Sequence, residues 1–582
     1  MAYGLSRCRL TSSAAAIGAA MLILAAQAET ARAIPINEDG TINVSIRAYV
    51  NARIGTMAKQ STRPGNQPPT CPADPNTCSF GGTFPYSGAG NLIQNRYFLE
   101  VKWNHDLLDW WSDILPKSVT SFKYNLTYRG EYEGIYDFGP SAYRNNLESR
   151  QEIEEILRQG GSSTDLATSR LQRTRHRLRE VASYRNRLFQ AFIDWEQGPV
   201  FIRFGRQNLA WGETDVFRLL DNINPIDSSF GGFFIDLDER RVPLNMLRAS
   251  YNIGSLGPMN QAFVEGYVAF DNTVAFIPGP PTGSPWATPL GPPSGVLLSD
   301  QIGPSRTFHN LRGGGRFVFN LEDFTFTLAS YQTMLDIPAV RFRAARPDDP
   351  GYAPNSVLTA EQFAPLVWVN GASMTTALPS LKSVLRSEIA WFKDEALFVG
   401  PTERGFPGKG VTADFAENFL LPVINGEFDT VSRQDTFNLA IGWDTNQLVR
   451  WINPQQTLFI STQFFYRHIF DYQELQSIPV PEPNNSQRTI PLVEDTFLHT
   501  FAINTTYNVH APFTKVNLQV TPGFNMFYDW QGMLLFQPGL RFTRDPWRFI
   551  VDYTTINSGV YRYQIGLVRD RSNVRVQLEY VL

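Results

Sequence analysis

Residues 42–54, INVSIRAYVNARI, alternate between two kinds of side chain. The even-numbered positions are Ile, Val or Ala, whereas most odd-numbered positions are polar, among them Asn43, Arg47 and Arg53. Because successive side chains of a β-strand point to opposite faces, this pattern predicts a strand with one apolar and one polar face. Thirteen residues are long for a strand of a soluble protein, but they suit a tilted strand that crosses a membrane.

The same two-faced pattern recurs along the chain. It appears at residues 122–129, 436–443, 515–521 and 574–582, with aromatic residues near the strand ends, as in the interfacial girdles of outer-membrane barrels. A soluble sandwich would also alternate, but with shorter strands. No later stretch reaches the roughly 18 consecutive apolar residues of a membrane helix. We therefore predict an all-β protein, a transmembrane antiparallel β-barrel.

The sequence predicts the number of strands less directly than it predicts the barrel. Eighteen strands can be placed, one of them near residue 564, and the run ALFVG at residues 396–400 would make nineteen. Bacterial single-chain barrels have an even number, so the sequence predicts about 16–18 strands. Residues 335–381 read as one of several long loops. Tight turns are expected at residues 197–199, 321–323 and 544–546.

Two segments have helical character. Residues 147–182 are rich in Glu, Gln, Leu and Arg and predict an inserted short helical segment, read most simply as a solvated cap with i,i+4 charge pairs. Residues 106–116, DLLDWWSDILP, predict a short amphipathic helix at the membrane rim, with Trp110 and Trp111 as interface anchors.

The N-terminus predicts an exported protein. Arg7 and Arg9 precede an apolar run at residues 14–28 and an A-x-A site at residues 31–33, which is the pattern of a secretory signal peptide. A transmembrane anchor is the alternative, but the run is short for a span. We expect a signal peptide over residues 1–33 and the barrel over residues 34–582, with no separate plug domain ahead of the first strand.

Composition narrows the partners and the chemistry. The chain has 582 residues, 13% of them aromatic, and a net charge of −4, which argues against a nucleic-acid partner. Cys71 and Cys78 predict a local disulfide in an oxidising compartment, since two thiolates alone make a poor metal site. No catalytic, cofactor or metal motif is present, so no cofactor is expected. A lipid hydrolase with one Ser and one His meeting at the barrel rim stays open as an alternative.

One stretch after a predicted strand differs from the rest. Residues 201–227, FIRFGRQNLAWGETDVFRLLDNINPID, begin with strand alternation and pass into a run rich in Gly and Asx residues, which predicts a structured loop over residues 207–243. The loop combines seven acidic residues with more large apolar groups than an exposed loop should carry. We interpret it as a candidate infolded constriction loop in the lumen, with an ordinary extracellular loop as the alternative.

The candidate ligand or constriction residues belong to this stretch. They are Arg203, Arg206, Trp211, Glu213, Asp215, Phe217, Arg218, Asp221, Asn224 and Asp227. Buried carboxylates need partners, so an infolded loop would require cations beside its acids. Arg203 is expected to point inward from the adjacent strand and supply one, with Arg206, Arg218 and the Arg240-Arg241 pair as the other available cations.

The motif GRQNLAWGETD…LLDNINPID, together with LRSEIAWF at residues 385–392, resembles the Gram-negative domain-of-unknown-function family 1302. The resemblance covers essentially the whole mature chain. It implies an outer-membrane barrel that contacts membrane lipid, with periplasmic or inner-membrane export components as candidate partners. Barrels commonly end in Phe or Trp, whereas this chain ends in Leu582, so Tyr580 is the candidate aromatic signal for the barrel assembly machinery.

Three functions are consistent with these observations. The first hypothesis is a passive outer-membrane channel for a hydrophobic or amphipathic small molecule, because of the apolar content of residues 207–243. The second is a porin for polar solutes, which would use the Arg, Lys and Asn residues of the strands. The third is the lipid hydrolase at the rim.

Overall fold

The structure is a computed structural model of the chain. It describes residues 34–56, 89–140, 183–214, 216–275, 285–286, 296–298, 310–336, 338–349, 357–398, 425–426, 431–472, 477–481, 487–491, 493–510, 517–558 and 571–582. The predicted signal peptide, the predicted disulfide between Cys71 and Cys78, the helical segment at residues 147–182 and the strand near residue 564 lie outside the described residues.

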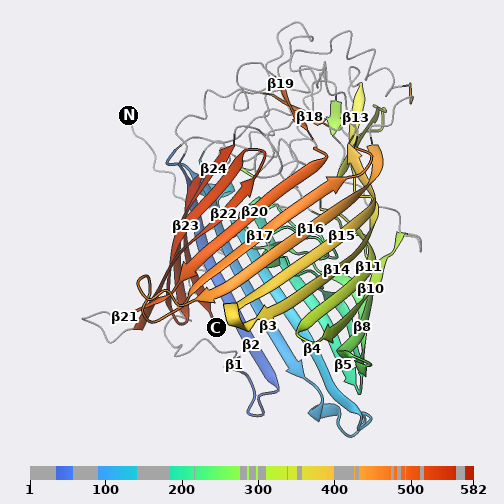
Figure 1. The fold of residues 1–582 in the computed structure, drawn as a ribbon, viewed down its shortest axis with the longest axis vertical. Coiled ribbons are helices and arrows are strands. Elements are labelled where there is room, and N and C mark those ends of the chain that lie inside the picture. The colour runs from blue at the N-terminus through green and yellow to red at the C-terminus, as the bar shows by residue number, and fades with distance from the viewer. Residues whose placement is uncertain are drawn as a thin grey trace, which may run out of the picture.

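The described strands form one closed antiparallel barrel, as the alternation predicts (Figure 1). The main sheet has 20 strands, of which the short β1 (Ile34–Pro35) and β21 (Tyr507–His510) are extensions and the other 18 form the barrel. In chain order these are β2 (Ile42–Gly55), β3 (Leu92–Asp106), β4 (Val119–Glu133), β5 (Tyr184–Gln197), β6 (Val200–Gln207), β7 (Leu244–Leu256), β8 (Met259–Ala269), β10 (Arg312–Leu321), β11 (Phe324–Met334), β14 (Leu366–Leu378), β15 (Ser383–Phe398), β16 (Val431–Gln447), β17 (Leu458–Ile469), β20 (Asp495–Thr505), β22 (Asn517–Asp529), β23 (Met533–Arg544), β24 (Trp547–Ser558) and β25 (Asn573–Val581).

The last strand closes the barrel against the first. β25 pairs with β2 along nine residues, and beyond the ladder the Leu582 N–H donates to the Ile46 carbonyl at 2.8 Å. Closure removes the two edges of the sheet, so the backbone groups of the wall can be satisfied within a bilayer. Among the described residues, no helix has the length and apolar content needed to cross a membrane.

The outer and inner faces of the wall follow the predicted alternation. On β25, Leu578 is 48% exposed, whereas its neighbours Gln577 and Glu579 are buried inside. The same holds on β15 and β16, where Ile389 and Ile441 are exposed on the outside. The outer face of a barrel that is apolar at mid-height contacts lipid, and the polar residues of each strand point into the lumen.

The two ends of the barrel differ. All three predicted tight turns are confirmed, because β5–β6, β10–β11 and β23–β24 are joined at those positions. The C-terminus and β21 lie at the end of the barrel that carries these tight turns. The small strands β13 (Leu358–Phe363), β18 (Ser477–Pro481) and β19 (Gln487–Pro491) lie at the opposite end (Figure 1). Short turns mark the periplasmic end, so the small strands, with β9 (Val296–Leu298) and β12 (Ala339–Ala344), lie at the extracellular end.

Three local expectations need correction. Residues 335–381 are not one long loop, since they contain β14, whose middle residues Asn370 to Ser373 are small or polar on both faces and hide the alternation. The run at 396–400 is no additional strand, because residues 396–398 continue β15 after a bulge. The helix expected at 106–116 is a single 3₁₀ turn, η3 (Asp109–Trp111), although Trp110 and Trp111 are exposed there as expected.

The remaining described helices are short. They are α2 (Ile135–Phe138) after β4, η7 (Pro379–Leu381) in the turn before β15, and η5 (Gly232–Phe234) and α6 (Leu237–Arg240) in the connection from β6 to β7. That connection, residues 208–243, is called the 208–243 segment below.

Candidate functional site

The 208–243 segment starts from an unusually short strand. β6 has 8 residues, whereas its neighbours β5 and β7 have 14 and 13. Near its end, Gly205 has a φ of 128°, and a Cβ there would lie 2.3 Å from the Ala191 carbonyl oxygen. Only glycine accepts this backbone conformation without strain, so the sequence lets β6 twist sharply just before the segment begins.

Asn224 joins the two ends of the segment. Its side-chain carbonyl accepts the Leu209 N–H at 2.8 Å, and its amide donates to the Val242 carbonyl at 2.9 Å. Nearby, the Val242 N–H donates to the Pro225 carbonyl at 2.8 Å. Asn224, one of the predicted ligand candidates, is fully buried and therefore fixes the base of the segment.

Further contacts reach opposite sides of the barrel. Glu239 of the segment accepts hydrogen bonds from Tyr49 on β2 and Arg96 on β3, at 2.6 and 2.8 Å. On the other side, the Glu388 carboxylate on β15 accepts the backbone N–H groups of Glu213 and Leu220, at 2.6 and 2.5 Å. Because β3 and β15 stand opposite each other in the closed strand order, the segment bridges the interior between them.

One side of the lumen is densely charged. We call it the charged wall; its inward-facing side chains come from β2, β3, β4, β5 and β25 and are Arg47, Arg53, Arg96, Glu100, Arg129, Glu131, Arg185, Arg187 and Glu579. Two acids of the segment complete its ion pairs. Glu239 pairs with Arg96 and Arg47, both at 2.8 Å, and Asp227 pairs with Arg185 at 2.5 Å.

The electrostatics of Glu239 illustrate the balance. Burial raises the pKa of Glu239, but Arg96 and Arg47 lower it by more, so the pKa lies below its ordinary value. The carboxylate is therefore ionised in its buried position. Without those cations a buried charge would be strongly unfavourable, so the segment depends on the charged wall for its place.

The other side of the lumen carries a cluster of apolar side chains, beside polar ones such as Glu388 and Arg386. We call it the apolar wall; its inward-facing residues come from β8, β11, β14, β15, β17, β22, β23 and β24 and include Tyr267, Tyr331, Val369, Phe392, Phe465, Phe527, Leu535 and Ile556. The segment covers it with Trp211, Leu219, Leu220 and Ile223. Phe217 is only partly buried, with ring centroids 4.9 Å from Phe465 and 5.4 Å from Phe527.

Trp211 anchors the segment to β8 and β11. It is 2% exposed, and its indole N–H donates to Glu265 on β8 at 2.7 Å. The rings of Tyr267 and Tyr331 meet it edge-on, with centroids 5.3 and 5.5 Å away. A buried Trp whose N–H has a carboxylate partner is held in both position and orientation.

The cations that were predicted to pair with the acids of the segment have different partners in the structure. Arg203 pairs with Asp194 on β5 at 2.6 Å and with none of the segment's described acids, because it lies near the periplasmic turn, three residues after β6 begins. Arg206 donates to the Phe189 carbonyl at 3.0 Å. Asp221 pairs with Arg241, one of the cations that were expected to serve it.

Arg218 binds within the segment and to the wall. Its guanidinium donates to the Asp221 and Asn224 carbonyls at 2.8 and 2.7 Å, and it pairs with Asp336 beyond β11. Burial raises the pKa of Asp221 despite the nearby Arg218 and Arg241. Asp215 lies outside the described residues.

Several site residues escaped the sequence reasoning. Arg96, Glu131, Glu239 and Glu265 are charged residues of strands or of the loop, where nothing in the sequence indicates their partners. Arg96 and Glu239 are 143 positions apart in the chain. Only Glu388 carried a signal, because it stands inside the LRSEIAWF stretch.

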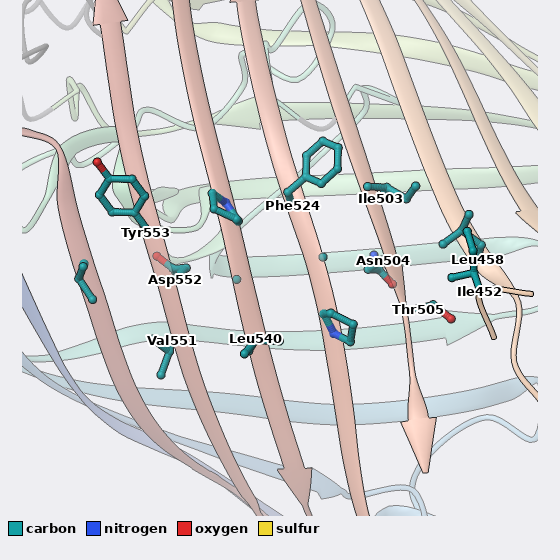
Figure 2. A pocket seen from close by; sticks show the side chains of 15 residues that line it. Ile452, Leu458, Ile503, Asn504, Thr505, Phe524, Leu540, Val551, Asp552 and Tyr553 are labelled. Carbon is teal, nitrogen blue, oxygen red and sulfur yellow. The ribbon is translucent and has the colours of Figure 1, made fainter. Parts of the chain in front are cut away.

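A separate hollow lies on the outer face of the wall (Figure 2). It has a volume of about 670 Å³ and is lined mainly by β20, β22, β23 and β24, including Phe524, Leu540 and Tyr553. Pro522 and Pro538 lie beside these larger side chains and leave the hollow between them. Leu540 and Tyr553 are exposed on the lipid-facing side, so this hollow is not part of the lumen.

The closed barrel with an apolar outer belt, polar inward side chains and short turns at one end defines an outer-membrane β-barrel protein of a Gram-negative bacterium. The chain belongs to the family described as "Protein of unknown function (DUF1302)", whose sequence profile matches residues 10–582. The resemblance seen in the sequence is therefore confirmed.

Several solved structures are similar to this chain. Acinetobacter baumannii OccAB1 is 10% identical with a TM-score of 0.39, covering 96% of this chain and 99% of that chain. Pseudomonas putida OprB is 10% identical with a TM-score of 0.38, covering 94% and 95%. The outer membrane channel DcaP of Acinetobacter baumannii is 9% identical with a TM-score of 0.31, covering 94% and 99%.

No curated protein matches the sequence. At such identities and TM-scores, the likeness to the solved structures says nothing about what this chain transports.

Proposed function

We propose that the protein is an outer-membrane channel for a hydrophobic or amphipathic small molecule, such as a lipid-like compound, and that the 208–243 segment narrows its lumen. The observation that carries the proposal is the apolar wall. Water-filled porins have polar interiors, whereas Phe392, Phe465 and Phe527 point inward here and pack beside the segment.

The two walls together suit a molecule with two parts. An apolar body could take the place of segment side chains such as Phe217 against Phe465, which recovers the favourable burial of about 25 cal/mol per Å² of apolar surface. A polar head would then face the charged wall. Phe217 is only partly buried and packs on Phe465 and Phe527, so it is a segment residue that a ligand on the apolar wall would displace.

The porin for polar solutes is the second candidate. It is favoured by the charged wall, whose inward-facing arginines and carboxylates could line an aqueous path. Many of these groups are already paired with one another or with Glu239 and Asp227. Solute passage would therefore require those pairs to be wetted or broken.

Mass spectrometry of compounds retained by the purified protein tests the proposal. We expect the wild-type barrel to retain an amphipathic compound, and Phe465→Asn to lose most of it. Phe464→Leu, on the adjacent outward-facing position, is the matched control and should retain it.

Vesicle-swelling assays with sugars decide between the two candidates. Rapid swelling with the wild-type protein and no retained amphipathic compound would establish the polar porin and contradict the proposal. Release of fatty acid from the vesicle lipid would instead indicate the hydrolase.

A further inference from the structure

Among the described residues, the hydrogen-bonded wall is incomplete beside β5. Residues Ala191 to Gln197 of β5 pair with β6, but residues 184–190 pair, within the described part of the chain, with β4 alone. β7 does not fill the interval, because its first residue Leu244 pairs with Gln207, the last residue of β6. The ladder on this side of β5 therefore ends where Ala191 pairs with Arg206.

The length of β6 places the interval in the outer leaflet. A membrane strand needs about 9–11 residues, whereas β6 has 8. With a rise of about 3.3 Å per residue and a tilt of about 40°, eight residues reach roughly 20 Å above the periplasmic turn. The apolar band of an outer-membrane barrel is about 25 Å tall, so about a fifth of it, on the extracellular side, lacks a β6 ladder among the described residues.

Side chains of the segment close this interval from within. Asp227 pairs at 2.5 Å with Arg185, on the part of β5 that pairs with β4 alone among the described residues, and the Arg185 guanidinium lies over the Phe230 ring at 4.4 Å from its centroid. Arg206 donates to the Phe189 carbonyl on the same part of β5. The wall here is held by side-chain contacts, which can open without breaking a strand ladder.

The outer border of the interval is apolar. Tyr184 and Leu188 are exposed on β5 above it, and Phe204 and Leu247 are exposed on β6 and β7 below it. Phe270, just after β8, is also exposed, and its ring lies 6.4 Å from that of Phe204. Lipid chains can therefore reach the interval from outside.

We propose that the interval between the extracellular half of β5 and the ends of β6 and β7 is a lateral portal. Through it an amphipathic molecule passes between the lumen and the outer leaflet, and the Arg185–Asp227 pair latches the segment across it. This inference rests on the proposed function and adds the route that the ligand takes.

Site-specific labelling tests the portal. In protein lacking Cys71 and Cys78, a single cysteine is placed at Ile226, beside the latch, or at Val369, a buried inward-facing position of the apolar wall. Each is combined with Asp227→Asn to release the latch. The proteins, in phospholipid vesicles, are treated with a maleimide tethered to a phospholipid headgroup or with a charged water-soluble maleimide.

We expect the lipid-tethered reagent to label Ile226→Cys at least about tenfold faster than Val369→Cys, because thiol modification follows access. Restoring Asp227 should slow that labelling. Equal labelling of both cysteines, or labelling of Ile226→Cys by the water-soluble reagent alone, would overturn the portal. Heat-modifiability on gels verifies folding, and Arg185→Gln replaces Asp227→Asn if the latter does not fold.

The portal and the proposed function fail in different ways. Retention of an amphipathic compound without lipid-tethered labelling overturns the portal and leaves the channel function in place. Sugar-driven swelling without any retained compound overturns the proposed function, whatever the labelling shows.

Discussion

The two walls of the lumen hold the 208–243 segment by different means. The charged wall binds it through ion pairs such as Arg96–Glu239 at 2.8 Å, and the apolar wall through contacts such as Phe217–Phe465 at 4.9 Å. A buried charge needs its partner at a specific position, whereas apolar surface only needs to be covered. The charged wall therefore fixes where the segment lies, and the apolar wall leaves a surface that another apolar molecule can occupy.

The largest effect is expected on the charged wall. Arg96→Ala removes one ion-pair partner from each of the buried carboxylates Glu131 and Glu239, which keep other arginines as partners. Breaking a buried pair from one side costs about 3–5 kcal/mol when no other partner is left, so the free energy of unfolding in lipid vesicles, measured with urea, should fall by up to that much. Lys102→Ala on the same strand is the control; its exposed ammonium pairs with Glu100, and the loss should be about 0–1 kcal/mol. Similar losses for both variants would mean that the charged wall does not position the segment.

A smaller effect is expected where the segment meets β15. Glu388→Gln keeps one oxygen acceptor and places an amide NH₂ against a backbone N–H of Glu213 or Leu220. An unsatisfied buried donor costs about 1–3 kcal/mol, which the same urea experiment would detect. Glu361→Gln, in the extracellular strand β13, should change the barrel's stability little. If Glu388→Gln is as stable as the wild type, the two hydrogen bonds do not hold the segment.

The smallest effect is expected on the apolar wall. Phe217→Leu keeps an apolar side chain but loses the ring contacts with Phe465 and Phe527, worth about 0.5–1.5 kcal/mol. Retention of the amphipathic compound should nevertheless change measurably, since Phe217 is only partly buried. Val216→Ala, at an exposed neighbouring position, should alter neither quantity. A loss of stability as large as that of Arg96→Ala would contradict the contrast between the walls.

The sequence predicted the fold well and the site only in part, for one physical reason. Two-faced alternation is a property of each strand alone, so residues 42–54 already indicate which side chains face the lumen. β14 was missed because Asn370, Gly371 and Ser373 place small or polar groups on both of its faces. The alternation also cannot say which inward-facing charges meet.

Arg203 and Arg96 illustrate the limit for the site. Both arginines point inward from alternating strands, and the sequence near Arg203 made it the natural partner for the acids of the following loop. The position of each arginine along the barrel axis decides its partner instead. Arg203 lies near the periplasmic end, beside Asp194, and Arg96 lies at the level of Glu239. That level follows from strand register and from the path of the segment, neither of which a single strand's pattern contains.

The conductance of single barrels in planar bilayers tests the central claim most directly. It compares the wild type with a deletion of residues 211–235 from the segment, and with a deletion of equal length, residues 339–363, that removes the extracellular strands β12 and β13. We predict that the wild type is nearly silent, that the 211–235 deletion opens a large and steady conductance, and that the 339–363 deletion resembles the wild type. A wild-type conductance that is already large, and that the 211–235 deletion leaves unchanged, would contradict the claim that the segment narrows the lumen.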